Sequence, residues 1–575
     1  MSCIRYIRAP RDLGMRRAAD ESLGASCSYH RVGDDARSSW PYLRRLIIAS
    51  TAVSLSVALI ASKLLGGSGV TAATFRVEGA NLQESDVVRS VNGWLNYTLR
   101  VEGGTWHLPY GQISFRTRLY NGGTPGPVLI ASPGDRIRIV IDNRLESDDG
   151  MSVLPSQVGW RRANTTNLHL HGIHDDAYHD NTFARVKPGQ SMVYQYQLEP
   201  RSGSTLLYYH PHADGAISLQ AFGGMGGAVV IEDAVQEAAL ALPAIRTHVL
   251  MLMGLDFDPL SNGLPNKDYV TTQLNNGNTS NFSPRLYNPT GFTGRVLLVN
   301  GGLPLREDVM AGQWVRLKLV NAVIHSLGAL LLGFDGSESE ESTCGLVVLA
   351  LDGVWLTEPR YVPSLLMPQG GRAEVLIGCS TAGVYTFGTL GKHKVLGSIL
   401  PDRSAVATLH VAPGSEGSTT SMATLPDTLP GPPVYYSDLR DAVVEKRDTI
   451  AFSTPTGGNV VNLRTYEPST PMFHLKLGSI VEWYLEGIED PGSYAKLHPY
   501  HQHTSHFQVI KVIADDKSVA SLLATEGEWR DTIPLYGRAS YVIRFVAPFE
   551  GMMTVHCHIQ KHAEQGMMAI AKIER

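Results

Sequence analysis

Short apolar runs separated by Gly, Pro and Asp turns recur along this chain, and this pattern predicts strands rather than helices. Three stretches share one arrangement of strand, glycine turn and alternating strand: residues 124–145, 297–322 and 474–487. A repeated unit of this kind indicates three related β-sandwiches in an all-β protein. The domains that we expect are 74–235, 244–413 and 434–575. A linker rich in Gly, Ser, Thr and Pro is expected at 414–433.

One apolar segment differs from the others because it is long and carries no charge. It runs from Leu46 to Ser62, and nine Arg but no Lys precede it in residues 1–45. A helix of this length spans about 25 Å, which is short for a hydrocarbon core of about 30 Å unless Leu64 and Leu65 extend it. The basic flank predicts that the N-terminus stays cytoplasmic and that everything after the segment is exported.

Two fates of this segment stay open. Residues 46–65 can serve as an uncleaved transmembrane anchor, with residues 1–45 cytoplasmic and without a folded domain. The small residues from Val70 to Ala73 are instead typical of a cleavage site, which would give a secreted protein. Export also fits a glycoprotein with four acceptor sequons, at Asn96, Asn164, Asn278 and Asn281.

Charge and composition narrow the function. The chain has 575 residues and a formal net charge of -5, so nothing suggests nucleic acid as a partner. The candidate functional residues are mainly histidines, because twelve of the twenty His fall in four short windows: 169–174, 210–212, 498–506 and 556–562.

Each window contains one His-x-His pair. Residues i and i+2 of a strand point to the same side, so each pair directs two imidazoles at one place. Four converging pairs supply eight imidazoles, which is more than one metal ion needs and predicts a cluster of metals. The pairs are His169 and His171, His210 and His212, His501 and His503, and His556 and His558.

A second kind of metal site is predicted around Cys557. This residue stands between the two His of the last pair, so its thiolate should point the opposite way. His498 lies at an odd offset from His501, which turns it toward the same side as the thiolate. With His562 and an axial Met567 these residues make the ligand set of a blue copper site.

Histidines without such spacing are expected to have ordinary structural roles. Isolated residues such as His174, His179 and His506 should lie at the surface or in the core. Zinc is also disfavoured for the paired histidines. Structural zinc uses four ligands in spaced pairs, and eight His with one Cys exceed that set.

The four windows resemble the copper signatures of the multicopper oxidase family, over roughly residues 74–575. The resemblance implies three consecutive Greek-key cupredoxin domains, O2 as a partner, and four coppers: one type 1, one type 2 and two type 3. It assigns type 2 copper to His169 and His501. It assigns the type 3 pair to His171, His210, His212, His503, His556 and His558. It assigns type 1 copper to His498, Cys557 and His562, with Met567 axial.

The resemblance also implies acidic residues that relay protons to the cluster. Asp180 matches the family's position best, with Asp175 and Asp176 as alternatives. Relatives carry an acid directly after the type 1 His, but this chain has Ala563 there, and Glu564 could serve instead. The expected catalytic residues are the electron link formed by Cys557 with its two neighbours, and the two acids: His556, Cys557, His558, Asp180 and Glu564.

The complete ligand set favours an oxidase over a non-catalytic relative. We expect laccase-like oxidation of phenols or aromatic amines, with a ferroxidase as the alternative. Iron oxidation would need carboxylates beside His498 and His562, for which the candidates are Glu489, Asp490, Glu526 and Glu528. A cuprous oxidase is disfavoured because the 15 Met form no Met-rich insert. Apart from Cys557, two cysteines follow the predicted anchor, and we expect them to form a disulfide: Cys344 and Cys379.

Overall fold

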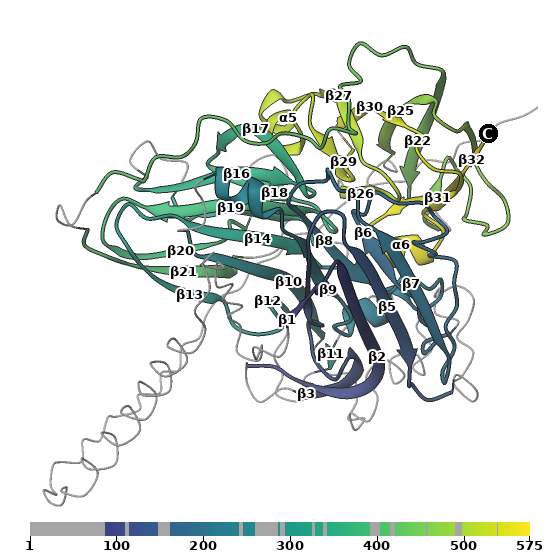
Figure 1. The fold of residues 1–575 in the computed structure, drawn as a ribbon, viewed down its shortest axis with the longest axis horizontal. Coiled ribbons are helices and arrows are strands. Elements are labelled where there is room, and N and C mark those ends of the chain that lie inside the picture. The colour runs from purple at the N-terminus through teal and green to yellow at the C-terminus, as the bar shows by residue number, and fades with distance from the viewer. Residues whose placement is uncertain are drawn as a thin grey trace, which may run out of the picture. The chain divides into compact units, whose positions relative to one another are not determined.

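The computed structural model describes residues 87–109, 114–147, 162–240, 245–258, 286–287, 294–324, 328–336, 342–391, 403–414, 420–455, 458–488, 497–537 and 539–575. They lie within one compact unit, Ala73–Arg575 (Figure 1). Strands make up 52% of the structure and helices 6%, which confirms the all-β class. The predicted anchor and cytoplasmic segment lie outside the described residues. Among the residues that are described, no helix has the length and apolar character needed to cross a membrane.

The first sandwich has two sheets. One has the spatial order β1 (Val87–Arg89), β4 (Val128–Ala131), β9 (Gly227–Ile231), β8 (Thr205–His210) and β6 (His169–His171). The other has the order β3 (Ser114–Tyr120), β2 (Trp94–His107), β5 (Arg136–Asn143) and β7 (Ser191–Gln197). Alternation explains the packing, because Ile137, Ile139 and Ile141 of β5 are all buried in the core between the sheets. Two short helices follow, α2 (Ile217–Phe222) and α3 (Ala234–Ala239).

The second sandwich repeats this plan. One sheet has the order β11 (Leu286–Tyr287), β10 (Thr247–Asp258), β14 (Val315–Asn321), β19 (Arg372–Cys379), β16 (Cys344–Leu351) and β17 (Val354–Tyr361), with β12 (Gly294–Val299) also on β10. The other has the order β13 (Leu305–Met310), β21 (Ala405–Ala412), β20 (Gly383–Thr389), β15 (Leu330–Phe334) and β18 (Ser364–Met367). Cys344 and Cys379 stand opposite each other in β16 and β19 and form the predicted disulfide.

The third sandwich carries the C-terminal half of the histidine windows. One sheet has the order β23 (Val460–Val461), β22 (Lys446–Ser453), β25 (Ile480–Ile488), β30 (Ala539–Val546), β27 (Phe507–Ala514) and β28 (Trp529–Arg530). The other has the order β24 (Phe473–Lys476), β32 (Met568–Glu574), β31 (Gly551–Cys557), β26 (Leu497–Gln502) and β29 (Thr532–Tyr536). Helices α5 (Lys517–Leu523) and α6 (Gln560–Glu564) complete it.

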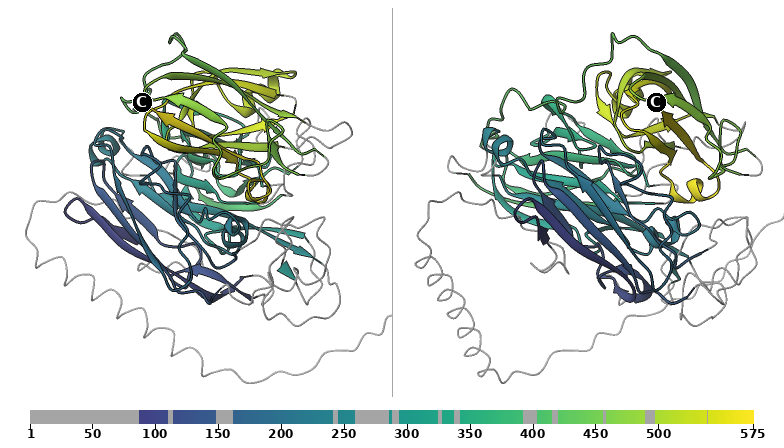
Figure 2. Two further views of the ribbon diagram at one scale, coloured as in Figure 1. Left: turned by 90° about the vertical axis from the view of Figure 1, so that its right-hand side faces the viewer. Right: turned by 45° about the vertical axis from the view of Figure 1, so that its right-hand side comes forward.

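The three sandwiches belong to one compact unit, Ala73–Arg575 (Figure 2). Trp106, Tyr208 and Val230 of the first sandwich pack with Met251 and Leu298 of the second in a shared buried cluster. Such a continuous apolar interface favours fixed positions of the sandwiches. Ligands from different sandwiches can therefore converge on one site.

The acceptor sequons divide between accessible and inaccessible sites. Asn96 is exposed, whereas Asn164 is buried and its amide donates to the carbonyl oxygen of Glu146. A glycan on Asn164 does not fit the buried position of this side chain, and glycosylation of the chain stays a prediction. The two other sequons, Asn278 and Asn281, lie outside the described residues.

Candidate metal centre

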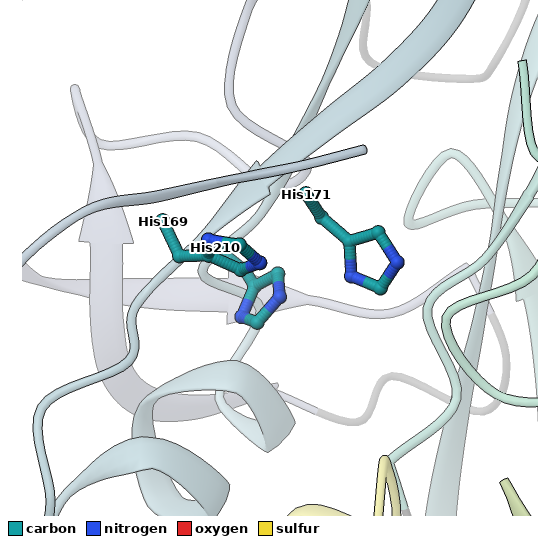
Figure 3. A group of neighbouring side chains, drawn as sticks. All are labelled: His169, His171 and His210. Carbon is teal, nitrogen blue, oxygen red and sulfur yellow. The ribbon is translucent and has the colours of Figure 1, made fainter. Parts of the chain in front are cut away.

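Backbone pairing brings the His-x-His segments together. In the first sandwich β6 pairs with β8 so that His169 stands opposite His210, and in the third β26 pairs with β31 so that His501 stands opposite His556. Figure 3 shows three rings from the first sandwich, including His171. All eight predicted side chains are at most 3% exposed: His169, His171, His210, His212, His501, His503, His556 and His558.

Hydrogen bonds fix the protons on the outward nitrogens. Nδ1 of His501 donates to the carbonyl oxygen of Asp531 at 2.9 Å, and Nδ1 of His556 donates to that of Cys557 at 3.0 Å. A carbonyl oxygen can only accept, so each of these Nδ1 atoms carries the proton and each Nε2 keeps a lone pair. His169 is held in the same way, because its Nδ1 lies 2.6 Å from Oδ2 of Asp180.

The inward nitrogens face one another. Nε2 of His169 lies 3.4 Å from Nε2 of His501, although both carry lone pairs. A second set converges on His556, whose Nε2 lies 3.2 Å and 3.1 Å from the Nε2 atoms of His212 and His503. Facing lone pairs repel, and a metal cation between them turns the repulsion into coordination.

Two further buried ring nitrogens have no hydrogen-bond partner. Nδ1 of His171 and Nε2 of His210 are buried among the described residues without a hydrogen-bond partner. Burial lowers the pKa of all eight imidazoles, to about 3 for His210 and to about 4 for His556. Neutral, buried imidazoles with unused lone pairs fit metal ions better than they fit any hydrogen-bonding role.

Cys557 points into a second donor set, as its place between two histidines predicts. Its Sγ lies 3.6 Å from Nδ1 of His498 and 3.7 Å from Nδ1 of His562, and the two nitrogens are 3.3 Å apart. Burial raises the pKa of the Cys557 thiol far above its usual range, so a thiolate here needs a cation beside it. One sulfur and two imidazoles in this arrangement fit copper.

Met567 belongs to the same neighbourhood. Its side chain is fully buried in the core cluster that contains Cys557. The Cys557 N–H donates to the Met567 carbonyl oxygen at 3.0 Å, and the Met567 N–H donates to the His562 carbonyl oxygen at 2.9 Å. The turn after α6 therefore places Met567 beside both proposed ligands.

The candidate acids occupy different surroundings. Asp180 is 2% exposed and touches the cluster through His169, and burial raises its pKa to about 7. Asp175 instead accepts from Nδ1 of His179 at 2.9 Å. Glu564 is buried and its carboxylate accepts a hydrogen bond from Ser218 of α2. Asp180 thus has the predicted contact, while a proton-relay role for Glu564 stays a prediction.

Sequence reasoning missed Asp531. Its carbonyl oxygen holds His501, and its Oδ1 lies 3.3 Å from Nε2 of His171. Oδ2 of Asp531 lies 3.2 Å from Nε2 of His506, a buried residue that we expected to have a structural role only. The available signal was the pair Arg530–Asp531, two adjacent charges between Trp529 and the strand-like run 532–536.

Fold and donor sets together define a copper protein with two linked metal sites. Profiles of the family described as multicopper oxidase match residues 157–236 and 438–574, and these two ranges contain all four histidine windows. The multicopper oxidase mco of Staphylococcus aureus is 24% identical over 85% of this chain and 91% of its own length. The iron transport multicopper oxidase of Kluyveromyces lactis is 23% identical, over 83% and 74%. Laccase-2 of Botryotinia fuckeliana is 24% identical, over 84% and 82%.

Solved structures agree on the fold. A multicopper oxidase of Pediococcus acidilactici superposes with a TM-score of 0.64 at 20% identity, covering 89% of this chain and 94% of that protein. The metallo-oxidase of Campylobacter jejuni gives 0.62 at 19% identity, covering 88% and 95%. This chain carries two regions that match multicopper oxidase models, and it is similar to multicopper oxidases over most of its length. It is a copper-dependent oxidoreductase that uses O2 as its electron acceptor.

Proposed function

We propose that this protein binds four coppers and couples the oxidation of phenols or aromatic amines, in the manner of a laccase, to the reduction of O2 to water. One observation carries the proposal. Cys557 contributes its sulfur to one donor set, while its two sequence neighbours contribute imidazoles to the other. When bound, copper supplies one-electron redox chemistry, and four coppers can hold the four electrons that O2 needs.

Each copper has a ligand set in the chain. The facing Nε2 atoms support His169 and His501 as the type 2 ligands. The sulfur and two Nδ1 atoms support His498, Cys557 and His562 as the type 1 ligands. The type 3 ligands are the remaining six residues of the cluster: His171, His210, His212, His503, His556 and His558.

The surroundings of His562 bear on the reductant. This side chain is 8% exposed and is the more accessible of the two proposed type 1 imidazoles. Residues 458–466 lie against its turn, because the Tyr466 N–H donates to the Gly566 carbonyl oxygen at 3.1 Å. That segment contains no Asp or Glu, and its only charged side chain is Arg464. Residues 458–466 themselves offer no carboxylate to Fe2+; acids close to this segment are Glu467, which follows it, and Asp214, which adds to the effect of burial in raising the pKa of Tyr466.

Two of the four candidate carboxylates for a ferroxidase, Glu526 and Glu528, have other described partners. Glu528 binds Arg360 and Arg530, in the wall of a cavity of about 300 Å³ between the second and third sandwiches. Glu526 accepts from the Val512 N–H. The other two candidates, Glu489 and Asp490, lie outside the described residues. These contacts support a phenol or aromatic amine over ferrous iron.

Oxygen consumption tests the proposal. Wild-type protein loaded with copper is compared on a phenol, an aromatic amine and Fe2+, with Cys557→Ser as the control that lacks the type 1 thiolate. We expect blue protein with four coppers per chain and faster O2 uptake with the organic reductants. Faster turnover of Fe2+ would overturn the laccase-like assignment and favour a ferroxidase. Colourless protein with no bound copper would overturn the ligand sets themselves.

The copper domains are proposed to lie outside the cytoplasm, held to a membrane by residues 46–65 or secreted after their cleavage. The disulfide between Cys344 and Cys379 supports this location, since such bridges persist mainly in oxidising compartments.

A further inference from the structure

A buried ion pair lies where the second sandwich meets the other two. Arg372 is the first residue of β19, and its side chain is 0% exposed. Its guanidinium binds the carboxylate of Asp531 through two bonds, one from Nη1 to Oδ1 at 2.6 Å and one from Nη2 to Oδ2. Two parallel bonds fix the orientation of a carboxylate as well as balancing its charge.

Asp531 extends this pair to the histidine cluster. Its Oδ1 accepts from Nε2 of His171 at 3.3 Å, and its carbonyl oxygen accepts from Nδ1 of His501 at 2.9 Å. The two rings are stacked, with centroids 3.6 Å apart. Both imidazoles therefore share Asp531 as a partner, together with the Thr532 hydroxyl at 3.2 Å from each ring, and the carboxylate of Asp531 is held by Arg372.

The rest of the Arg372 side chain binds backbone from two sandwiches. Nε donates to the Leu206 carbonyl oxygen of β8 at 3.3 Å, and Nη2 donates to that of Asp352 at 2.9 Å. All three guanidinium nitrogens therefore have acceptors, which leaves the group one orientation. Its position is fixed by the first and second sandwiches, whereas the carboxylate that it holds belongs to the third.

The backbone of the second sandwich also touches the cluster directly. Gly370 has φ +82, and a Cβ atom there would lie 2.8 Å from Cδ2 of His558 and 3.0 Å from Cε1 of His171. Only glycine fits at that distance from the rings. The second sandwich thus contacts the cluster although it contributes none of the proposed ligands.

We propose that Arg372 is a positioning residue for the copper cluster, through which the second sandwich orients His171 and His501 by way of Asp531. The inference rests on the proposed assignment of these two histidines to copper. A buried ion pair adds little net stability compared with apolar side chains of similar volume. The described contacts of this ion pair instead indicate a role in metal binding, because residues that orient metal ligands contribute to the affinity for the metal.

Arg372→Lys tests the proposal with the charge retained, because an ammonium group cannot make the two parallel bonds. The matched control is Arg316→Lys. Arg316 is 2% exposed, lies on β14 of the same sheet and pairs with the carboxylates of Glu374 and Glu237. Neither of these partners belongs to the histidine cluster.

Copper retention is measured on purified protein during titration with a chelator, from the number of coppers bound per chain and from the blue type 1 band. We expect Arg372→Lys to lose the copper of the histidine cluster at about 10–100-fold lower chelator concentration, because the carboxylate that it no longer holds contacts His171. The blue band should be lost as in wild type, and Arg316→Lys should match wild type in both measurements. Equal retention in the two variants would overturn the inference while leaving the copper assignments intact. Wild-type protein without copper would instead overturn the proposed function.

A double variant covers the case in which Arg372→Lys does not fold. Arg372→Gln with Asp531→Asn removes both charges together, so neither remains buried without its partner. We expect it to fold and to show the same selective loss of copper from the histidine cluster. If both variants fail to fold while Arg316→Lys folds, Arg372 joins the sandwiches rather than positioning ligands, and the inference is wrong.

Discussion

Replacing Asp180 with Asn should weaken the binding of type 2 copper. In wild type, Oδ2 of Asp180 accepts from Nδ1 of His169 at 2.6 Å, while Oδ1 accepts from the Leu170 N–H at 2.9 Å and the Tyr196 hydroxyl at 3.2 Å. The carboxylate therefore receives three donors and offers none. An amide of the same shape must turn its NH2 group toward one side or the other.

Both orientations of the amide are unfavourable. If the NH2 group faces His169, the ring must move its proton from Nδ1 to Nε2, the nitrogen that faces His501. If it faces Leu170 and Tyr196, two buried donors lose their acceptor, at about 1–3 kcal/mol for an unsatisfied group. Loss of a residue that orients a metal ligand typically reduces the metal affinity about 10–100-fold, which corresponds to about 1.4–2.8 kcal/mol of binding free energy.

Chelator titration of the copper-loaded protein measures this loss through the type 2 electron paramagnetic resonance signal. Asp175→Asn is the matched control, because Asp175 lies in the same loop but pairs with His179. We expect Asp180→Asn to release type 2 copper first and Asp175→Asn to behave as wild type. Identical titration curves for the two variants would refute the reasoning.

Four other outcomes are expected. Cys557→Ser should remove the blue absorption and substrate oxidation while the histidine cluster still binds copper, so a persistent blue band would exclude the type 1 assignment. Met567→Leu should keep the blue colour and raise the type 1 reduction potential in a redox titration, and a lower or equal potential would point to another axial group. Replacing Cys344 and Cys379 together with Ala should lower the free energy of unfolding by about 4 kcal/mol in denaturant titrations. An unchanged free energy of unfolding would show that the disulfide does not stabilise the fold. Cell fractionation and N-terminal sequencing should find mature protein in the membrane fraction with residues 46–65 retained, whereas soluble protein beginning near residue 73 would show a cleaved signal.

The ligands could be predicted from sequence because the signal is local. A His-x-His pair on a strand directs both rings to one side wherever the strand lies, since side chains alternate with a period of two. The same alternation predicts that Cys557 and His498 point to the opposite side. In the structure, Sγ of Cys557 lies 3.6 Å from Nδ1 of His498. Alternation of apolar residues likewise predicted the sandwiches, because burial between two sheets selects one face of each strand.

The residues that orient the proposed ligands could be identified only from the tertiary structure. Asp531 and Arg372 are 159 positions apart and lie in different sandwiches, so no periodicity links them. The family resemblance favoured Asp180 over Asp175, but only the fold of one loop against β6 shows that Asp180 contacts His169. A lone charged residue in a sequence can serve as a surface group, an ion pair or a ligand support. Packing of the three sandwiches decides which, because a buried charge must end beside whatever partner that packing brings within hydrogen-bond distance.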